Sequence, residues 1–260
     1  MKKITKNGVI YLVFDSFEKY NFIQHGFSTK KGGFSKGYFS SMNLRLTSLD
    51  NPAIVEKNFE KFLELFDLTK KNTVLTNQVH GKNIVKVAGY IENNEVSDGL
   101  VTNVVNIGLM TFHADCIPVY FADIKKKIVG LVHSGWGGTL EGIAVEMIDL
   151  MEKAYDSRKE DIIVGIGPGI GSCCYEVGKE LYDQFISKDK RYGLFFKKKT
   201  TKYMLDLKGL IQYDLMNNGI LEENIEVSDL CTKCNMDLFF SHRGQGLKRG
   251  GMAAIIKKVR

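Results

Sequence analysis

The chain has 260 residues, of which 44% are hydrophobic and 25% charged, and its formal net charge is +6. A chain of this length and composition buries a globular core without disulfide cross-links, and its apolar runs are too short to cross a bilayer. The lysines form short scattered clusters without interleaved aromatic side chains, which argues against nucleic-acid binding and leaves a mild preference for phosphorylated small molecules.

Short β-rich runs alternate with amphipathic segments, which predicts a mixed α/β fold in a single domain over residues 1–260. Asn51 and Pro52 are the N-cap and first residue of a predicted helix, whose apolar positions recur at helical spacing as far as Phe66. The predicted elements that follow are strands at 73–79, 83–87, 104–112, 119–122 and 128–132, a helix at 139–154, a strand at 162–166, helices at 179–186 and 206–216, and strands at 238–241 and 253–259.

Two histidines stand at the ends of predicted strands. His80 opens a turn with Gly81 and Lys82, and His133 precedes the turn S-G-W-G-G. Cys116 also lies near a strand end, because the Pro118 that follows cannot donate to a central ladder. Side chains at such positions point into a crevice rather than into the packed sheet. The three could converge, although two structural histidines and one buried thiol would give the same pattern.

The run T-F-H-A-D-C-I-P-V-Y-F at 111–121 contains a local pair, His113 and Cys116. Residues three apart on a strand point to opposite faces. A strand that stays regular through Cys116 would therefore let one of the two face a given site. Asp115 would share a face with His113, which predicts a structural pairing of those two.

The five cysteines are an odd number and predict reduced thiols, and no signal-peptide pattern opens the chain, so we expect a cytoplasmic protein. Cys173 and Cys174 are interpreted as a buried or lining thiol pair. The C-x-x-C of Cys231 and Cys234 lacks a second knuckle, which argues against a zinc ribbon. The glycine turn S-G-W-G-G before a helix could cradle an anion, although it is not a P-loop.

Seven motifs occur in a recognisable order: H-G-F-S-T-K-K-G-G-F-S-K-G, N-Q-V-H-G, D-G-L-V-T, A-D-C-I-P-V, V-H-S-G-W-G-G-T, G-P-G-I-G-S-C-C-Y-E-V-G and C-T…F-F-S-H-R. In this order they resemble the YfiH family, a group first described as laccase-domain polyphenol oxidases and now as zinc-dependent purine nucleoside phosphorylases. The resemblance covers essentially the whole chain. It implies a layered α/β/β/α fold with mixed sheets, similar to the catalytic domain of cytotoxic necrotising factor.

The resemblance also implies a catalytic zinc site made by His80, Cys116 and His133, with His113 outside it. Three protein ligands leave a fourth zinc position open, as in catalytic sites, where the ion can act as a Lewis acid. The expected partners are phosphate and a purine nucleoside: adenosine, inosine or methylthioadenosine. With water in place of phosphate, the same site could deaminate adenosine.

Three further residues are expected near the substrate. Asn43 and Arg243 occupy motif positions of the family, and Asp115 is a supporting candidate beside Cys116. The chain departs from the family at two positions where arginine is frequent: Gly137 follows the tryptophan of the glycine turn, and Phe59 follows K-N in the first helix. If either arginine holds phosphate or ribose in relatives, the substrate preference here would differ.

Three other functions fit parts of the pattern. Two histidines and a cysteine are also the ligands of a blue-copper site, so a copper-dependent polyphenol oxidase is one alternative, although a multicopper enzyme needs more imidazoles. A cysteine hydrolase with Cys116 as nucleophile, acting in peptidoglycan precursor editing, is the second. A non-enzymatic module that uses zinc for shape is the third. Neither nucleic acid nor a membrane is expected as a partner, and the oligomeric state is not predicted.

Overall fold

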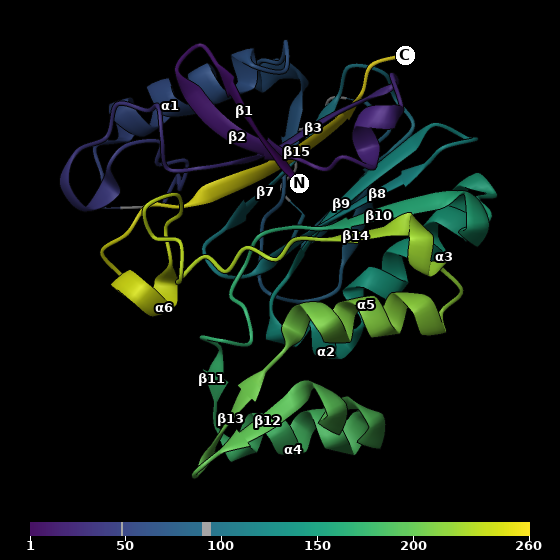
Figure 1. The fold of residues 1–260 in the computed structure, drawn as a ribbon. Coiled ribbons are helices and arrows are strands. Elements are labelled where there is room, and N and C mark those ends of the chain that lie inside the picture. Colours follow the sequence, from purple (N-terminus) through teal and green to yellow (C-terminus); the bar gives the residue numbers. More distant parts are fainter. Residues whose placement is uncertain (48, 90–94) are drawn as a thin grey trace.

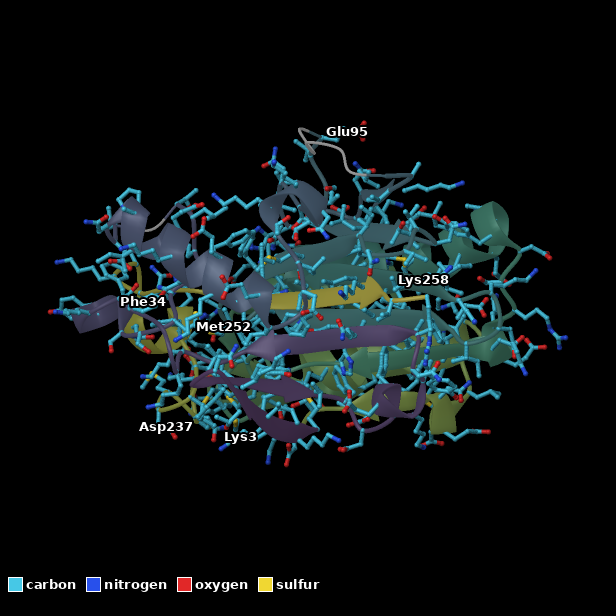
Figure 2. The ribbon with its side chains drawn as sticks, turned by 90° about the horizontal axis from the view of Figure 1, so that it is seen from above. Lys3, Phe34, Glu95, Asp237, Met252 and Lys258 are labelled. Carbon is cyan, nitrogen blue, oxygen red and sulfur yellow. The ribbon has the colours of Figure 1, made fainter. Side chains whose placement is uncertain are left out.

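Two mixed β-sheets stacked face to face form the centre of the structure (Figure 1). The computed structural model describes residues 1–47, 49–89 and 95–260. Across these ranges the upper sheet has the order β1 (Lys2–Lys6), β2 (Val9–Val13), β3 (Ile23–Ser28), β15 (Met252–Lys258), β7 (Gly108–His113) and β4 (Thr73–Leu75). The lower sheet has the order β14 (Ile225–Val227), β10 (Ile162–Ile166), β8 (Ile117–Asp123), β9 (Ile128–Ser134), β6 (Gly99–Thr102) and β5 (Ile84–Lys86). Seen from above, β15 runs through the middle of the molecule from Met252 to Lys258 (Figure 2).

Helices cover the outer face of each sheet. α1 (Pro52–Glu64) lies over the upper sheet, and α2 (Trp136–Glu141), α3 (Ile143–Tyr155) and α5 (Leu207–Asn217) lie under the lower one (Figure 1). Beyond α5 lie α4 (Lys179–Lys188) and a small sheet of β11 (Glu176–Val177), β13 (Lys202–Leu205) and β12 (Phe196–Lys199), while the one-turn α6 (His242–Gln245) lies to one side (Figure 1). The predicted mixed α/β class is confirmed. In the described part of the chain, no helix combines the length and the apolar character that crossing a membrane requires.

Apolar side chains fill the three spaces between these layers. Phe62 of α1 and Ile255 of β15 belong to the cluster between α1 and the upper sheet. Tyr120 of β8 belongs to the cluster between the two sheets, and its neighbour Phe121 to the cluster between the lower sheet and the helices, because successive strand residues point to opposite faces. β8 and β9 are buried along their whole length, as strands covered on both faces are.

Several predicted boundaries are wrong for identifiable reasons. The strand predicted at 73–79 ends at Leu75. The helix predicted at 139–154 is two helices, α2 and α3, which are separated by Gly142 in the left-handed region with φ 90°. The segment at 238–241 is not a strand. Its Phe239 and Phe240 are fully buried in the core between the sheets, so the apolar run reflects packing rather than strand pairing.

Two of the crossings between the sheets lie close together near one end of the sandwich. β4 pairs with β7 in the upper sheet, whereas β5 pairs with β6 in the lower one, so the segment between Leu75 and Ile84 is a crossover and not the hairpin turn of a single sheet. β7 and β8 also belong to different sheets, and residues 114–116 link them. These two crossings carry His80 and Cys116.

Candidate metal centre

Three side chains from remote parts of the chain meet at these crossings. His80, Cys116 and His133 place one ligand atom each within 4.8 Å of one another. His133 lies in β9 opposite Pro118 of β8, which puts it beside Cys116. The rings of His80 and His133 are nearly perpendicular, with centroids 4.8 Å apart. Two imidazoles and one thiol at this spacing could hold one metal ion.

Asp98 connects the two histidines and was not assigned a role from the sequence. Its carboxylate is fully buried. One oxygen accepts hydrogen bonds from His133 Nδ1 at 2.8 Å and from the His80 amide at 3.0 Å. The other oxygen accepts from the amides of Gly81 at 2.8 Å and Val79 at 3.1 Å. Asp98 therefore orients His133 so that Nε2 is directed away from the carboxylate, the arrangement of a metal-binding histidine, and holds the His80 segment.

The charges at the site follow from burial and from Asp98. Burial alone would raise the pKa of Asp98, but the hydrogen bonds from His133 and from the Gly81 and Val79 amides bring its pKa below the ordinary value. Burial lowers the pKa of His133 despite the bond to Asp98, and His80 adds to this effect. Burial raises the pKa of the Cys116 thiol to about 12, with Asp115 contributing. Burial therefore favours the neutral imidazole of His133 and a Cys116 thiol that needs a bound cation to ionise at neutral pH.

Local sequence explains how the His80 segment is held in place. The side-chain amide of Gln78 donates to the Phe112 carbonyl at 2.9 Å, and its oxygen accepts from the Phe112 amide at 2.7 Å. Gln78 thus continues the pairing with β7 after the β4 backbone has turned away. His80 itself has φ 65°. A left-handed residue here lets three successive amides converge on Asp98.

The glycine turn S-G-W-G-G packs directly against the His80 segment. A Cβ atom on Gly135 would lie 3.0 Å from His80 Cδ2 and 3.3 Å from Cys116 Sγ. A Cβ atom on Gly137 would lie 2.9 Å from the His80 carbonyl, and one on Gly138 would lie 2.8 Å from the Gly81 carbonyl. The glycines therefore allow a close approach of α2 to the metal centre. This close approach explains why the turn is rich in glycine, and no bound anion is needed to explain it.

His113 lies beside the group but makes other bonds. Its Nε2 is 2.7 Å from Thr111 Oγ1, its Nδ1 is 3.1 Å from the Cys116 carbonyl, and its ring is 5.2 Å from that of His133. The strand ends at His113, and Asp115 has φ 90°. The expected alternation through Cys116 is therefore wrong, and so is the pairing of His113 with Asp115.

The three residues expected near the substrate form hydrogen bonds to other parts of the chain. Asp115 is buried and accepts from Thr232 Oγ1 at 2.6 Å and from the Arg243 amide at 2.7 Å, so it joins loops behind Cys116. Asn43 is fully buried, and its side-chain oxygen accepts from the amides of Arg45 and Gly251, each at 3.0 Å. The Arg243 guanidinium donates to the Glu176 carbonyl at 2.7 Å and lies over Tyr175. Through these contacts Asp115 and Asn43 tie neighbouring segments of the chain together.

A cavity of about 450 Å³ opens onto the metal centre. Besides the three candidate ligands and His113, its lining includes Arg45 and Arg249, which the sequence analysis missed. Both arginines are half-buried, and Arg249 Nε finds no acceptor among the described residues. Burial lowers the pKa of Arg249, and the neighbouring Arg45 lowers it further. Two guanidinium groups that line the same cavity favour an anionic ligand there.

The remaining four cysteines form a second group. Cys173, Cys174, Cys231 and Cys234 place their sulfurs within 4.8 Å of one another. The C-x-x-C of Cys231 and Cys234 therefore has a partner pair after all, contrary to the expectation from the sequence. The adjacent Cys173 and Cys174, which lie about 60 residues earlier in the chain, supply it.

Comparison with known proteins gives consistent matches along almost the whole chain. The family described as multi-copper polyphenol oxidoreductase laccase matches residues 24–258. Purine nucleoside phosphorylase YlmD of Bacillus subtilis is 35% identical over 244 residues, covering 89% of this chain and 87% of that protein. The crystal structure of YlmD from Geobacillus stearothermophilus has a TM-score of 0.88 at 32% identity and covers 100% of both chains. A Bacillus licheniformis protein described as hypothetical protein YfiH has a TM-score of 0.86 at 34% identity, with 97% of both chains covered.

Proposed function

This chain belongs to the multi-copper polyphenol oxidoreductase laccase family, and from that premise we propose that it is a zinc-dependent purine nucleoside phosphorylase. The similar YlmD protein of Bacillus subtilis is named a purine nucleoside phosphorylase. One observation carries the proposal: the His80, Cys116 and His133 group and two half-buried arginines line the same cavity. A phosphorolytic site needs to bind an anionic nucleophile and a nucleoside side by side, and this cavity offers charge for the first and space for the second.

The residues of the group fit zinc. Two neutral imidazoles and one thiolate are a donor set that zinc accepts, with a fourth position left for an exogenous ligand. His133 Nδ1 is engaged by Asp98, which leaves Nε2 for the ion. When bound, zinc would supply a Lewis acid and a positive charge at that fourth position. Asp98 would keep both histidines in place through His133 Nδ1 and the His80 amide.

We propose Arg45 and Arg249 as the phosphate contacts, in place of Arg243. Arg243 lies outside the described lining of the cavity, whereas Arg45 and Arg249 face it together with the candidate metal ligands. Guanidinium groups bind phosphate oxygens in pairs of parallel hydrogen bonds. Asn43 would act indirectly, because its side-chain oxygen fixes the amide of Arg45.

In the proposed reaction a phosphate oxygen forms a bond to C1′ of the nucleoside as the bond from C1′ to the purine nitrogen breaks. The electron pair of that bond leaves with the base, which takes up the proton released by the phosphate. The second product is ribose 1-phosphate, or its 5-methylthio derivative from methylthioadenosine. Arg45 and Arg249 would hold the phosphate in line with C1′, which is a positioning contribution. The proposed substrates are adenosine, inosine and methylthioadenosine.

The histidines also weigh against a multicopper oxidase. The chain has five histidines, and three of them are used elsewhere. His25 accepts from the Phe14 amide at 2.7 Å in the core, His113 has contacts at both ring nitrogens, and His242 is exposed on α6. Two imidazoles beside Cys116 are too few for a multicopper cluster. A cysteine hydrolase is disfavoured because the pKa of Cys116 is raised to about 12, so little thiolate would form without a cation.

The test is phosphorolysis of adenosine by protein stripped of metal with a chelator and then supplied with buffered zinc. We expect activity to be lost on stripping and restored by zinc. His80→Ala should remain inactive at zinc concentrations that saturate the parent protein. His242→Ala, which removes an exposed histidine, is the matched control and should behave like the parent. Full activity of metal-free protein would refute the proposal.

We also propose that the same site deaminates adenosine, with water as the nucleophile at C6 of the purine. The products separate the two reactions, because phosphorolysis yields adenine and ribose 1-phosphate whereas deamination yields inosine and ammonia. Omitting phosphate should stop the first reaction and leave the second. Absence of ammonia at saturating zinc would remove deamination from the proposal and leave phosphorolysis intact.

A further inference from the structure

The second cysteine group joins two loops on the lower part of the molecule. Cys173 and Cys174 lie between β10 and β11, and Cys231 and Cys234 lie between β14 and α6. The two loops already touch through a bridge between Gly169 and Cys231. The Thr232 amide also donates to the Gly169 carbonyl at 3.0 Å. Backbone contacts between the two loops therefore help to bring the four thiols together.

The spacing of the sulfurs is that of ligands around one ion. Cys234 Sγ is 3.4 Å from Cys173 Sγ and 3.5 Å from Cys174 Sγ. A tetrahedral zinc thiolate site has Zn–S bonds of about 2.3 Å, so its sulfurs lie about 3.8 Å apart. The observed distances are near this value and well above the bond length of about 2.05 Å in a disulfide. All four sulfurs lie within 4.8 Å, whereas a cluster of several irons spreads its thiolates over different metal atoms.

The surroundings suit a negatively charged metal thiolate. The Gly171 amide donates to Cys231 Sγ at 3.2 Å, and amide hydrogen bonds of this kind orient and stabilise metal-bound sulfur. Lys208 is 6% exposed, and its ammonium donates to the carbonyls of Ser228 and Leu230. Burial lowers the pKa of Lys208, whereas Cys231, Asp206 and Asp229 act in the opposite direction. A buried cation requires nearby negative charge, and ionised cysteines would provide it.

From this arrangement we propose that Cys173, Cys174, Cys231 and Cys234 bind a second zinc ion, with four thiolates and a structural role. Adjacent cysteines on one loop replace the usual spaced pair, and Cys231 and Cys234 keep the spacing of a zinc knuckle. Four protein ligands leave no open position, in contrast to the three-ligand group in the cavity. The second ion would therefore take no direct part in turnover.

The two loops that carry the second cysteine group also contact the turn that carries Cys116. The Ile170 amide donates to the Asp115 carbonyl at 2.8 Å, and Thr232 Oγ1 donates to the Asp115 carboxylate at 2.6 Å. One residue of each of these two loops thus bonds to the turn that carries Cys116. The second zinc would keep these loops together and support the turn from behind.

The experiment measures zinc per chain by elemental analysis after equilibration of full-length protein with zinc under reducing conditions and removal of unbound metal. We expect two ions in the parent protein, one in His80→Ala and one in Cys234→Ser. Ser172→Ala alters an exposed neighbour of the cluster and should keep both. Cobalt-loaded His80→Ala should show the strong thiolate-to-metal charge-transfer absorption of a four-sulfur site, and its Tm should fall when the metal is stripped.

The outcomes separate this proposal from the proposed function. One zinc in the parent and none in His80→Ala would overturn the second site and leave the first standing. Iron in place of zinc, or a disulfide between cluster cysteines in reduced protein, would also overturn it. Two ions in a parent protein that shows no phosphorolysis would support the second site and refute the proposed function. The zinc contents of the parent and of His80→Ala, the cobalt spectrum and the Tm do not use Cys234→Ser, so failure of that variant to fold does not affect the test.

Discussion

Replacing Asp98 by asparagine should weaken both the first metal site and the fold. The carboxylate accepts four hydrogen bonds, two at each oxygen. An asparagine keeps one acceptor oxygen and turns an amide donor towards two other donors, whichever way it is oriented. Two bonds to a charged acceptor are then lost, at about 1.5–3 kcal/mol each. Part of this loss falls on stability and part on metal binding, where carboxylate partners of metal-bound histidines are worth about 10–100-fold in affinity.

The assay for Asp98→Asn is phosphorolysis of adenosine at a series of buffered zinc concentrations. The zinc concentration at half-maximal rate should rise about 10–100-fold, which corresponds to about 1.4–2.7 kcal/mol. Asp123→Asn is the matched control, because Asp123 is also fully buried and its bonded oxygen accepts the Lys125 and Lys126 amides at the far end of β8. It should leave the zinc midpoint unchanged. An unchanged midpoint in folded Asp98→Asn would refute the role given to this carboxylate.

Three further predictions follow from single contacts. Gly135→Ala should weaken zinc binding roughly tenfold, because its Cβ would lie 3.0 Å from His80 Cδ2; a zinc titration that matches the parent contradicts this. Arg249→Ala should lower kcat/KM for phosphate about 10–100-fold through loss of a charge-assisted bond, whereas the exposed Lys248→Ala should not, and equal effects would count against the proposed contact. The pKa of buried His25 is lowered to about 3, so between pH 6.5 and 3 the unfolded chain binds the proton and the folded chain does not. Stability is therefore full above pH 6.5 and declines as pH falls; from pH 7.5 to 5 His25 should account for about 2 kcal/mol of the decline. His25→Gln, compared by denaturant unfolding at both pH values, should show a decline smaller by that amount, and an equal decline would disprove the assignment.

The sequence predicted the layers of the fold better than the connections between them. Apolar periodicity located β8, β9, β10, α1 and α5, because these elements are long and contribute to a core. It did not show that β4 and β5 belong to different sheets, since a short turn reads the same whether it closes a hairpin or crosses a sandwich. It also read Phe239 and Phe240 as a strand, because a buried loop and a buried strand have the same composition.

The parts of the candidate site that were missed depend on contacts between residues far apart in the chain. Asp98 precedes a glycine, so its sequence context is that of a turn, and its partners lie 17 to 35 residues away. Arg45 and Arg249 are separated by most of the chain. A single arginine in a sequence does not show whether its side chain lines a cavity. The two cysteine pairs are about 60 residues apart, so neither pair alone supplies the four ligands of a structural zinc site.

The crossover between β4 and β5 has a consequence for the mechanics of the molecule. His80 lies in the crossover that joins β4 of the upper sheet to β5 of the lower sheet, whereas His133 lies in β9 of the lower sheet. An ion bound to both histidines would connect this crossover to the lower sheet. A shift of the upper sheet relative to the lower one would then change the distance between the two ligands. The distance between the ligands of the ion therefore depends on the relative position of the two sheets.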